Sequence, residues 1–267
     1  MKYQPIERSE LIELVRDLSI CLGDIDTSKI TDMSSLFWQS FRIDYAGIET
    51  WDVSNVTNME NMFRHIFFLE VADLKNWNVS NVRNMRAMFM GTRNLISDLS
   101  GWDVSAVEDM SSMFYGSDFN QDISKWNISN VKKMSYMFAD SFFNKPLNDW
   151  NVSNVIDMVA IFSGSKFNQT LDKWEINPKC CIDKFIFARV RPIQTEMLPQ
   201  RVRDFISKHM DEVLVDYDET FDGTIVDCTD DEIVKGIKKK KRKRKSPVIK
   251  KKTLSDGTIE ITRYREL

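Results

Sequence analysis

The sequence has little of the chemistry on which enzymes and metal proteins depend. It contains two histidines and four cysteines in 267 residues, and no pair of cysteines has the C-x-x-C spacing of a metal or redox site. A glycine-rich phosphate loop, a G-x-S-x-G motif and an H-E-x-x-H motif are also absent. These absences favour a protein that is not an enzyme and that has neither a metal site nor a cofactor.

One acidic segment offers an alternative to that interpretation. Asp216, Asp218, Asp222 and Asp227 have the oxygen ligands that a divalent cation prefers. The segment is superficially similar to a calcium loop, but the distal glutamate that completes such a loop is missing at the required spacing.

Long hydrophobic runs are absent as well. No stretch approaches the roughly 18 consecutive apolar residues of a membrane span, and the N-terminus lacks the apolar core and cleavage site of a secretory signal. We interpret the cysteines as reduced thiols, which fit an intracellular compartment. We therefore expect a cytoplasmic protein without a membrane span, with a nuclear location in a eukaryotic host or export by a signal-independent route as alternatives.

The net charge of −3 conceals two opposite blocks. Residues 211–232 contain ten acidic and no basic side chains, whereas residues 238–252 contain eleven basic and no acidic ones. Outside the basic run the chain has 26 basic against 40 acidic side chains, a balance of −14. Blocks of this kind usually mark tails or solvated segments rather than core.

What the sequence does have is a thirteen-residue phrase that occurs five times. Its copies are Trp51–Phe63, Trp77–Phe89, Trp102–Phe114, Trp126–Phe138 and Trp150–Phe162. A further tryptophan, Trp174, opens a degenerate copy, and the spacing between successive tryptophans is constant from Trp102 onward. A fixed period of this length is the signature of a solenoid, in which each copy buries its apolar side chains against its neighbours.

We number each copy from its tryptophan, so that +8 is the eighth residue after it. Apolar residues recur at −3, 0, +2, +5, +8, +11 and +12, and methionine occupies +8 in all five copies. We interpret the methionines and tryptophans as core residues rather than as a metal-binding box or a carbohydrate-binding ladder. The spacing of 0 and +2 predicts a short strand that pairs in parallel with the next copy. Serine at +3 predicts a corner, and the M-x-x-M-F pattern from +8 to +12 predicts a helical or 3-10 turn.

The repeats divide the chain into four regions. Residues 1–22 are an N-terminal helical cap, with Ser9 as the expected N-cap and an apolar face of Leu11, Ile12, Leu14, Val15 and Leu18. Residues 23–176 form about six coils plus a degenerate terminal copy, which Pro178 is expected to stop. Residues 177–214 contain a closing segment and a second helix from about residue 200 to 214.

The fourth region, residues 215–267, is an acidic and then basic extension. The Asp256–Gly257 pair between two β-prone runs predicts a hairpin there. The basic run predicts a localisation signal or a nucleic-acid patch, and a solvated segment that neutralises the acidic block is the alternative. Its residues are Lys238, Lys239, Lys240, Lys241, Arg242, Lys243, Arg244 and Lys245.

A polar column at +1 is the candidate partner-binding site. It points away from the apolar residues at 0 and +2, and repeat proteins commonly bind partners over such extended surfaces. The alternative is that the column is only a ladder of hydrogen bonds that keeps the protein soluble. The column consists of Asp52, Asn78, Asp103, Asn127 and Asn151.

The phrase W-D-V-S-N-V-T-N-M, the trailing M-F and the approach F-N-Q-D-I-S-K-W resemble one known family over about residues 23–176. They are similar to the BspA-like leucine-rich-repeat surface proteins of the branch with a mycoplasma-type repeat. The resemblance implies a leucine-rich-repeat-like solenoid of short parallel strands and short helical turns, used for adhesion or for binding a protein partner. It implies no catalytic residues, and the basic tail leaves a targeted effector or a nucleic-acid-associated protein as the alternative function.

Overall fold

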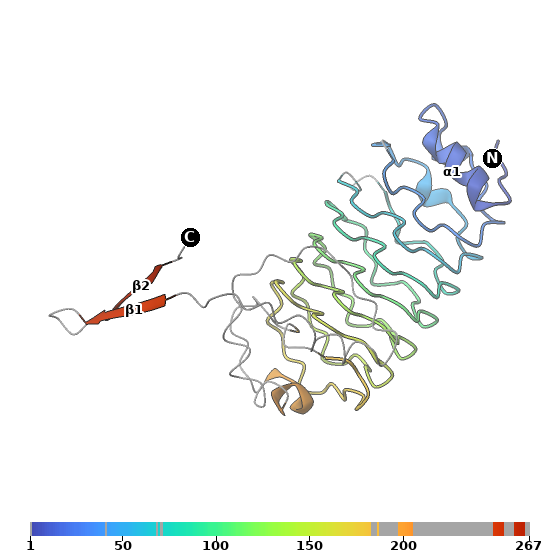
Figure 1. Ribbon diagram of the computed structural model, residues 1–267. Helices are drawn as coiled ribbons and strands as arrows, with labels where there is room; N and C mark the ends of the chain where they lie inside the picture. Colours follow the sequence, from blue (N-terminus) through green and yellow to red (C-terminus); the bar gives the residue numbers. More distant parts are fainter. Residues whose placement is uncertain are drawn as a thin grey trace, which may run out of the picture. The chain divides into compact units, whose positions relative to one another are not determined.

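The chain divides into two units, Met1–Thr220 and Phe221–Leu267, which are described separately below. The computed structural model describes residues 2–40, 42–67, 69, 72–182, 186, 197–204, 248–253 and 259–264. In the first unit, successive copies of the repeat run side by side as a stack of coils (Figure 1). No helix in the described part of the chain is long and apolar enough to cross a membrane.

The coils are joined in parallel at position +7. Isolated parallel bridges link Asp32 to Asn58 and continue through the same position of every later copy to Cys181. Around this position the backbone makes a regular ladder, because alternate N–H groups donate to carbonyls of the next copy. In one junction the donors are Met59, Asn61, Phe63 and His65, with N···O distances of 2.7–2.9 Å.

This ladder corrects the predicted place of the strand. Parallel pairing was expected at 0 and +2, but the ladder runs through the segment from +6 to +14. The tryptophan N–H instead closes a local turn, as in the bond from Trp77 to the Leu74 carbonyl at 3.1 Å. The apolar residues at 0 and +2 show only that both positions are buried. A single pair of buried positions two residues apart fits a strand and a buried turn equally well.

The predicted helical turn from +8 to +12 is also wrong. Residue +10 has φ between 49° and 57° in six successive copies, and residue +14 has φ between 53° and 69°. A helix requires negative φ throughout, so a left-handed residue at each of these positions converts the M-x-x-M-F segment into tight turns. The residue at +10 still donates its N–H to the next coil, as Ala87 does to Ser111 at 2.8 Å. Inter-coil bonding therefore compensates for the unfavourable backbone conformation.

The core is a set of columns, each formed by the same position in successive copies. The methionines at +8 are fully buried in every copy, which confirms their predicted place in the core. The phenylalanines at +12 stack ring on ring along the whole series, with centroids 5.3–5.8 Å apart and planes within 9°. A second row of Phe119, Phe143 and Phe167 contacts the first row at 4.0–4.2 Å. Such repetition buries the same apolar surface at each junction.

The tryptophans add a polar tie between coils. Each ring is 3–5 % exposed, and each indole Nε1 donates to the backbone carbonyl at −3 of the preceding copy at 2.8–3.2 Å. A buried indole N–H needs such a partner, since an unpaired donor costs about 1–3 kcal/mol. The tryptophans are thus structural, as the sequence predicts.

The N-terminal edge of the stack is covered twice. Tyr3 pairs in parallel with Ile25, and the helix α1 (Arg8–Arg16) buries Leu11 and Val15 against the first coil. Two details of the predicted cap are wrong. The N-cap is Glu7 rather than Ser9, which lies inside the helix, and Leu18 lies beyond the helix end with 61 % of its surface exposed.

Two short 3-10 turns, η1 (Leu22–Asp24) and η2 (Ile48–Thr50), lead into the first copies. A buried arginine links this region to α1. The Arg42 guanidinium donates to the carbonyls of Val15, Asp17 and Ile20 at 2.7–3.1 Å, which satisfies acceptors at and just beyond the helix end.

At the other end, the degenerate copy does not stop at Pro178. Cys181 occupies position +7 of that copy and pairs with Asp157, in the same way as its counterparts in earlier copies, and Ile186 accepts a bond from the Phe162 N–H at 3.1 Å. Proline is tolerated because position +4 lies in a turn, where its fixed φ fits and no ladder bond is lost. Arg201, in the helical residues 200–204, donates to the carbonyls of Asn177, Pro178 and Cys180. The rest of the predicted closing segment and second helix lies outside the described residues, apart from 182, 186 and 197–204.

In the second unit, β1 (Val248–Thr253) pairs antiparallel with β2 (Ile259–Tyr264). The register joins Thr253 to Ile259, so the Asp256–Gly257 pair lies in the short connection, as expected for a hairpin. The connection itself and the run Lys238–Lys245 are outside the described residues.

The left-handed residues generate a direct test. Ala87 is a left-handed residue with 3 % exposure, and glycine has no Cβ penalty there. We expect Ala87→Gly to raise the free energy of unfolding by about 0.5–1 kcal/mol in urea melts. The matched control is Ala139→Gly, which removes an equally buried methyl where φ is not positive and is expected to destabilise. Equal destabilisation by both changes would contradict the assignment.

Candidate partner-binding surface

The predicted column at +1 is exposed in all five copies, but its side chains are engaged locally. Each Oδ1 accepts the backbone N–H of the serine at +3, at 2.9–3.2 Å. In the copies of Asn78 and Asn151 the serine hydroxyl donates to the same oxygen at 2.7 Å. These are Asx turns, which shape the corner that serine at +3 predicts.

A second amide reinforces the corner from copy to copy. The asparagine at +4 donates its Nδ2 to the carbonyl of the +3 residue in the preceding copy at 2.7–3.0 Å. The donors are Asn55, Asn81, Asn130, Asn154 and, one position earlier in its copy, Asn177. The side chains at +1 and +4 thus hold the corner and join it to the neighbouring copy, and the +1 side chains remain exposed.

One junction lacks this amide. Ala106 stands at +4 in the copy of Trp102, within the same turn as the asparagines of the other copies, closed by the bond from Val107 to Val104 at 3.0 Å. We expect Ala106→Asn to stabilise the stack by about 1 kcal/mol, because its amide would reach the Ser80 carbonyl. Asn130→Ala should cost a similar amount, and both effects are measurable as shifts of the urea midpoint. An unchanged midpoint for Ala106→Asn would show that the amides do not join the coils.

The corner also predicts a pH dependence. Hydrogen bonds from the hydroxyl and backbone N–H of Ser105 hold the pKa of Asp103 below its usual range. A lowered folded pKa stabilises the fold above the unfolded pKa, and this stabilisation is lost as pH falls through the folded pKa.

Asp103→Asn preserves the acceptor of the turn, as Asn78 and Asn127 do in their own copies. Because the amide is neutral, it lacks the extra stabilisation of the charged carboxylate, so we expect a small loss of stability at pH 7. Between pH 7 and below about pH 4 we expect a smaller further loss than in the unmodified chain. Thermal melts between pH 7 and pH 2.5 measure both. Asp103→Ala is the control, since it removes the acceptor and should destabilise throughout this range.

Several of the positions that differ between copies lie on the ladder segment. We call the residues at +9 and +13 the ladder face. At +9 they are Ser34, Glu60, Arg86, Ser111, Ser135 and Val159; at +13 they are Trp38, Arg64, Met90, Tyr115, Ala139 and Ser163. The residues at +8, +11 and +12 between them are buried, and the ladder bonds keep the backbone of adjacent copies in register. A regular backbone therefore carries an irregular set of side chains at +9 and +13, of which Ser111, Ser135 and Ala139 are buried and the others are at least partly exposed.

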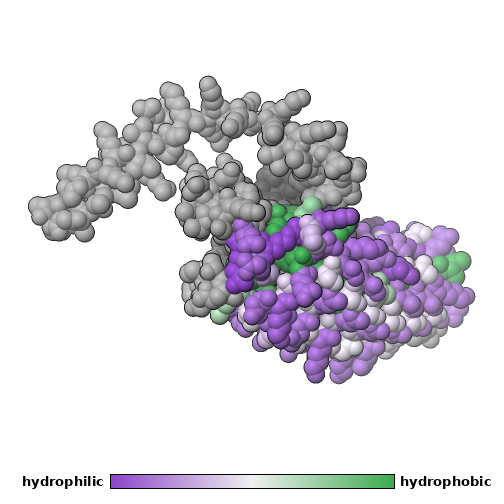
Figure 2. Space-filling view, turned by 90° about the horizontal axis from the view of Figure 1, so that it is seen from below, coloured by the Kyte–Doolittle hydropathy of each residue, from purple (hydrophilic) through white to green (hydrophobic). Residues whose placement is uncertain are grey.

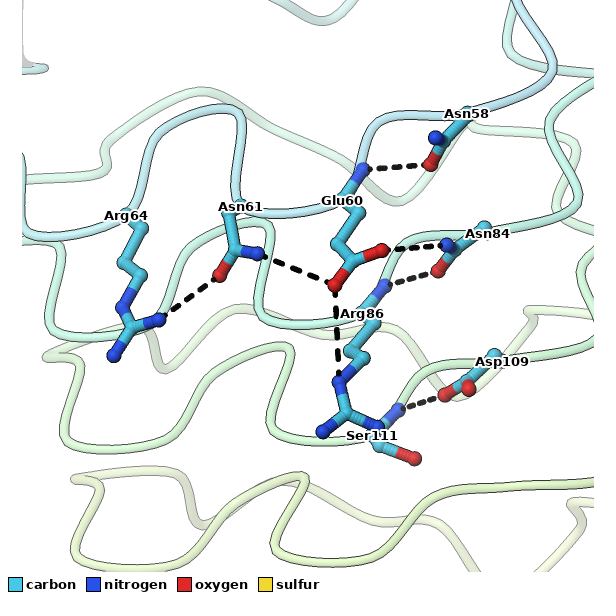
Figure 3. Close-up of polar contacts among 8 residues, drawn as sticks. All are labelled: Asn58, Glu60, Asn61, Arg64, Asn84, Arg86, Asp109 and Ser111. Carbon is cyan, nitrogen blue, oxygen red and sulfur yellow. Dashed lines mark hydrogen bonds and ion pairs between the residues drawn. The ribbon is translucent and has the colours of Figure 1, made fainter. Parts of the chain in front are cut away.

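A polar network occupies the ladder face across the first copies (Figure 3). Glu60 is its centre: its carboxylate accepts the amides of Asn61 and Asn84 at 3.3 and 3.2 Å and lies 3.9 Å from Nε of Arg86. Asn61 in turn accepts a bond from Arg64 at 3.3 Å. The side chains at +7, such as Asn84, accept the backbone N–H at +9 and hold the turn in place.

Arg64 continues this network toward the N-terminal end of the stack. Its guanidinium lies over the ring of Trp38, 5.5 Å from the centroid, and Trp38 is 38 % exposed. Its Nε is buried and has no hydrogen-bond partner. Ser135 Oγ, also on the ladder face, is likewise buried and has no hydrogen-bond partner. Buried polar atoms are normally paired, and Arg203 Nε, in the helical residues 200–204, is a further exception among the described residues.

The face in Figure 2 is mostly hydrophilic, with hydrophobic surface limited to small areas. Among the described residues of the repeats, the large apolar side chains that are more than half exposed lie in different copies, namely Ile43, Phe67, Ile96 and Phe142. Beside α1, Lys2, Tyr3 and Glu13 help to line a shallow hollow of about 510 Å³. Among the described residues, no group of three or more His, Cys, Asp or Glu side chains is placed to hold a metal ion. The acidic segment of residues 216–227 lies outside that part.

Periodicity could not identify the ladder face, because it selects what repeats. The signal that was available is the opposite one: positions +9 and +13 change in charge, size and polarity while the methionine at +8 and the phenylalanine at +12 are constant.

Comparison with known proteins gives one match. The model of a family described as "Mycoplasma protein of unknown function, DUF285" matches the chain over residues 9–118 and 93–195, and the two matches together span every copy of the repeat. No curated protein and no solved structure matches the chain.

Proposed function

The chain belongs to the DUF285 family of mycoplasma-type repeat proteins, and from this premise we propose that it is a non-enzymatic scaffold that binds a protein partner through the ladder face. In this proposal the stacked coils are a leucine-rich-repeat-like solenoid, related to the BspA-like surface proteins. Parallel bridges at position +7 of each copy and the continuous core support the solenoid.

One contrast supports the choice of face. The corner residues at +1 and +4 are nearly constant, and their hydrogen bonds serve the turn and the neighbouring coil. The ladder face combines tryptophan, tyrosine, methionine and arginine with charged and small residues. Aromatic residues and arginine are the side chains that most often dominate binding energy at protein interfaces. A rigid backbone also reduces the conformational cost of binding.

The basic run Lys238–Lys245 supports a second proposal, a targeted effector or nucleic-acid-associated protein. Eleven basic residues between 238 and 252 would attract phosphate through charge alone. Localisation in cells with and without residues 238–245 separates this role from scaffold binding. Partner capture that is independent of these residues would leave the scaffold proposal intact.

Paired substitutions in the same two copies test which face binds. The ladder-face variant is Met90→Ser with Tyr115→Ser, and the corner variant is Asn78→Ser with Asp103→Ser, which keeps a hydroxyl acceptor for the turn. Partners are captured from the native cells and quantified by mass spectrometry, with thermal melts as the folding control. We expect the ladder-face variant to lose about tenfold in partner recovery and the corner variant to lose less than twofold. Equal recovery by both variants, or loss by the corner variant alone, would contradict the proposed face.

A further inference from the structure

Arginine is unevenly distributed along the repeats. Between Trp51 and Ile176 there are four arginines, Arg64, Arg83, Arg86 and Arg93, and all four belong to the copies that begin at Trp51 and Trp77. Two of them, Arg64 and Arg86, lie on the ladder face of adjacent coils. On the ladder segment from +6 to +14, these two copies together carry Arg64, Arg83 and Arg86 against Glu60, a balance of +2. The same segment of the two flanking copies carries acidic residues and no basic one.

The arginines outside the ladder face are used differently. Arg42 donates to three backbone carbonyls at one end of the stack, and Arg201 donates to three at the other. The hydrogen bonds of those two guanidinium groups therefore stabilise the fold. Arg64 has one side-chain hydrogen bond, to Asn61, and a ring contact with Trp38.

Arg86 is held by one weak ionic contact. Its Nε lies 3.9 Å from Glu60, and its side chain retains 25 % exposure. Glu60 also receives the Asn61 and Asn84 amides, so its two oxygens are divided among three donors. The network therefore orients both guanidinium groups without saturating their five donors each.

The position of Arg64 also has an energetic cost. Its buried Nε lacks a partner, a deficit of the kind that natural proteins keep where function requires it. A glutamine or leucine at this position would avoid that deficit. The stacked, oriented guanidinium is the feature that remains to be explained.

We infer that Arg64 and Arg86 form a binding site for a short acidic protein segment, whose carboxylates they hold while its apolar side chains contact Trp38 and Met90. The inference rests on the proposed scaffold function and specifies its partner. An arginine fork matches a carboxylate with two parallel hydrogen bonds.

A polynucleotide fits this site less well. Arg64 already covers a face of Trp38, which removes a stacking platform for a base. In the two copies that flank the arginine-bearing ones, position +7 is acidic: Asp32 on one side and Asp109 on the other. These carboxylates would repel a polyphosphate long enough to reach them. The ladder segment of these two copies has a balance of only +2, which suits a segment with a few carboxylates.

The test is photo-crosslinking to the full chain, because it distinguishes this site from the basic tail. The probe is the peptide EELEELE with its first leucine replaced by benzoylphenylalanine, and the control peptide has glutamine in place of glutamate. Cross-linked residues are located by mass spectrometry. We expect the acidic peptide to label residues 38–93 and the glutamine peptide to label them at least fivefold less. Labelling confined to residues 238–252 would overturn the inference.

Variants identify the arginines that bind. We expect R64Q and R86Q each to reduce labelling of residues 38–93 about tenfold. The matched control is K132Q, which removes the same charge from an exposed pair with Glu108 and should leave this labelling within twofold. Thermal melts confirm that each variant is folded. Equal loss in all three variants, or full displacement of the peptide by an equal concentration of a single-stranded DNA 20-mer, would overturn the proposed ligand class.

This experiment can fail separately from the scaffold proposal. If Met90→Ser with Tyr115→Ser loses its captured partners while R64Q labels normally, the scaffold stands and the acidic-segment site is wrong. If the ladder-face pair captures partners normally, the proposed scaffold face is contradicted, even where R64Q and R86Q lose labelling.

Discussion

The structure depends on the backbone hydrogen bonds that pass from each coil to the next between +6 and +14. A single coil has neither a regular helix nor a regular strand to satisfy its own peptide groups, so its neighbours must do so. The same junctions bring the phenylalanines at +12 into one stack and place each tryptophan N–H against a carbonyl of the preceding copy. Bonding and burial are therefore achieved together, once per junction, and neither is complete in an isolated copy.

This arrangement separates two groups of residues. Tryptophan, methionine and phenylalanine fill the core, and the amides at +1 and +4 shape the corner, which leaves them little freedom to vary. The side chains at +9 and +13 are attached to the same regular backbone, but the backbone does not dictate which residue type stands there. Glu60, Arg64 and Arg86 illustrate the difference, because their network spans two coils, whereas the copies that begin at Trp102, Trp126 and Trp150 have no charged residue at +9 or +13.

The sequence predicted burial better than backbone conformation. The repeated apolar positions identify the core. Met110 and Phe114, for example, stand at positions that recur in the copies, and both are fully buried. The same pattern misplaced the paired segment, because M-x-x-M-F has helical spacing but includes a left-handed residue that no periodicity reveals. Ala87 and Tyr136 share this conformation without sharing any side-chain property. Pro178 was assigned as a stop on local propensity, whereas contacts across the junction continue the pattern through it. The ladder face was missed because only the fold shows that +9 and +13 adjoin between copies.

The equal spacing of the last copies has a genetic consequence. Even spacing along the chain holds for Trp102, Trp126, Trp150 and Trp174. The same positions donate and accept the ladder bonds in each successive junction. Unequal recombination that removes or duplicates one such unit would leave every surviving junction with its usual partners. The gene can then lengthen or shorten by whole coils. The area of exposed surface would change in this way while the contacts that stabilise each junction stay the same.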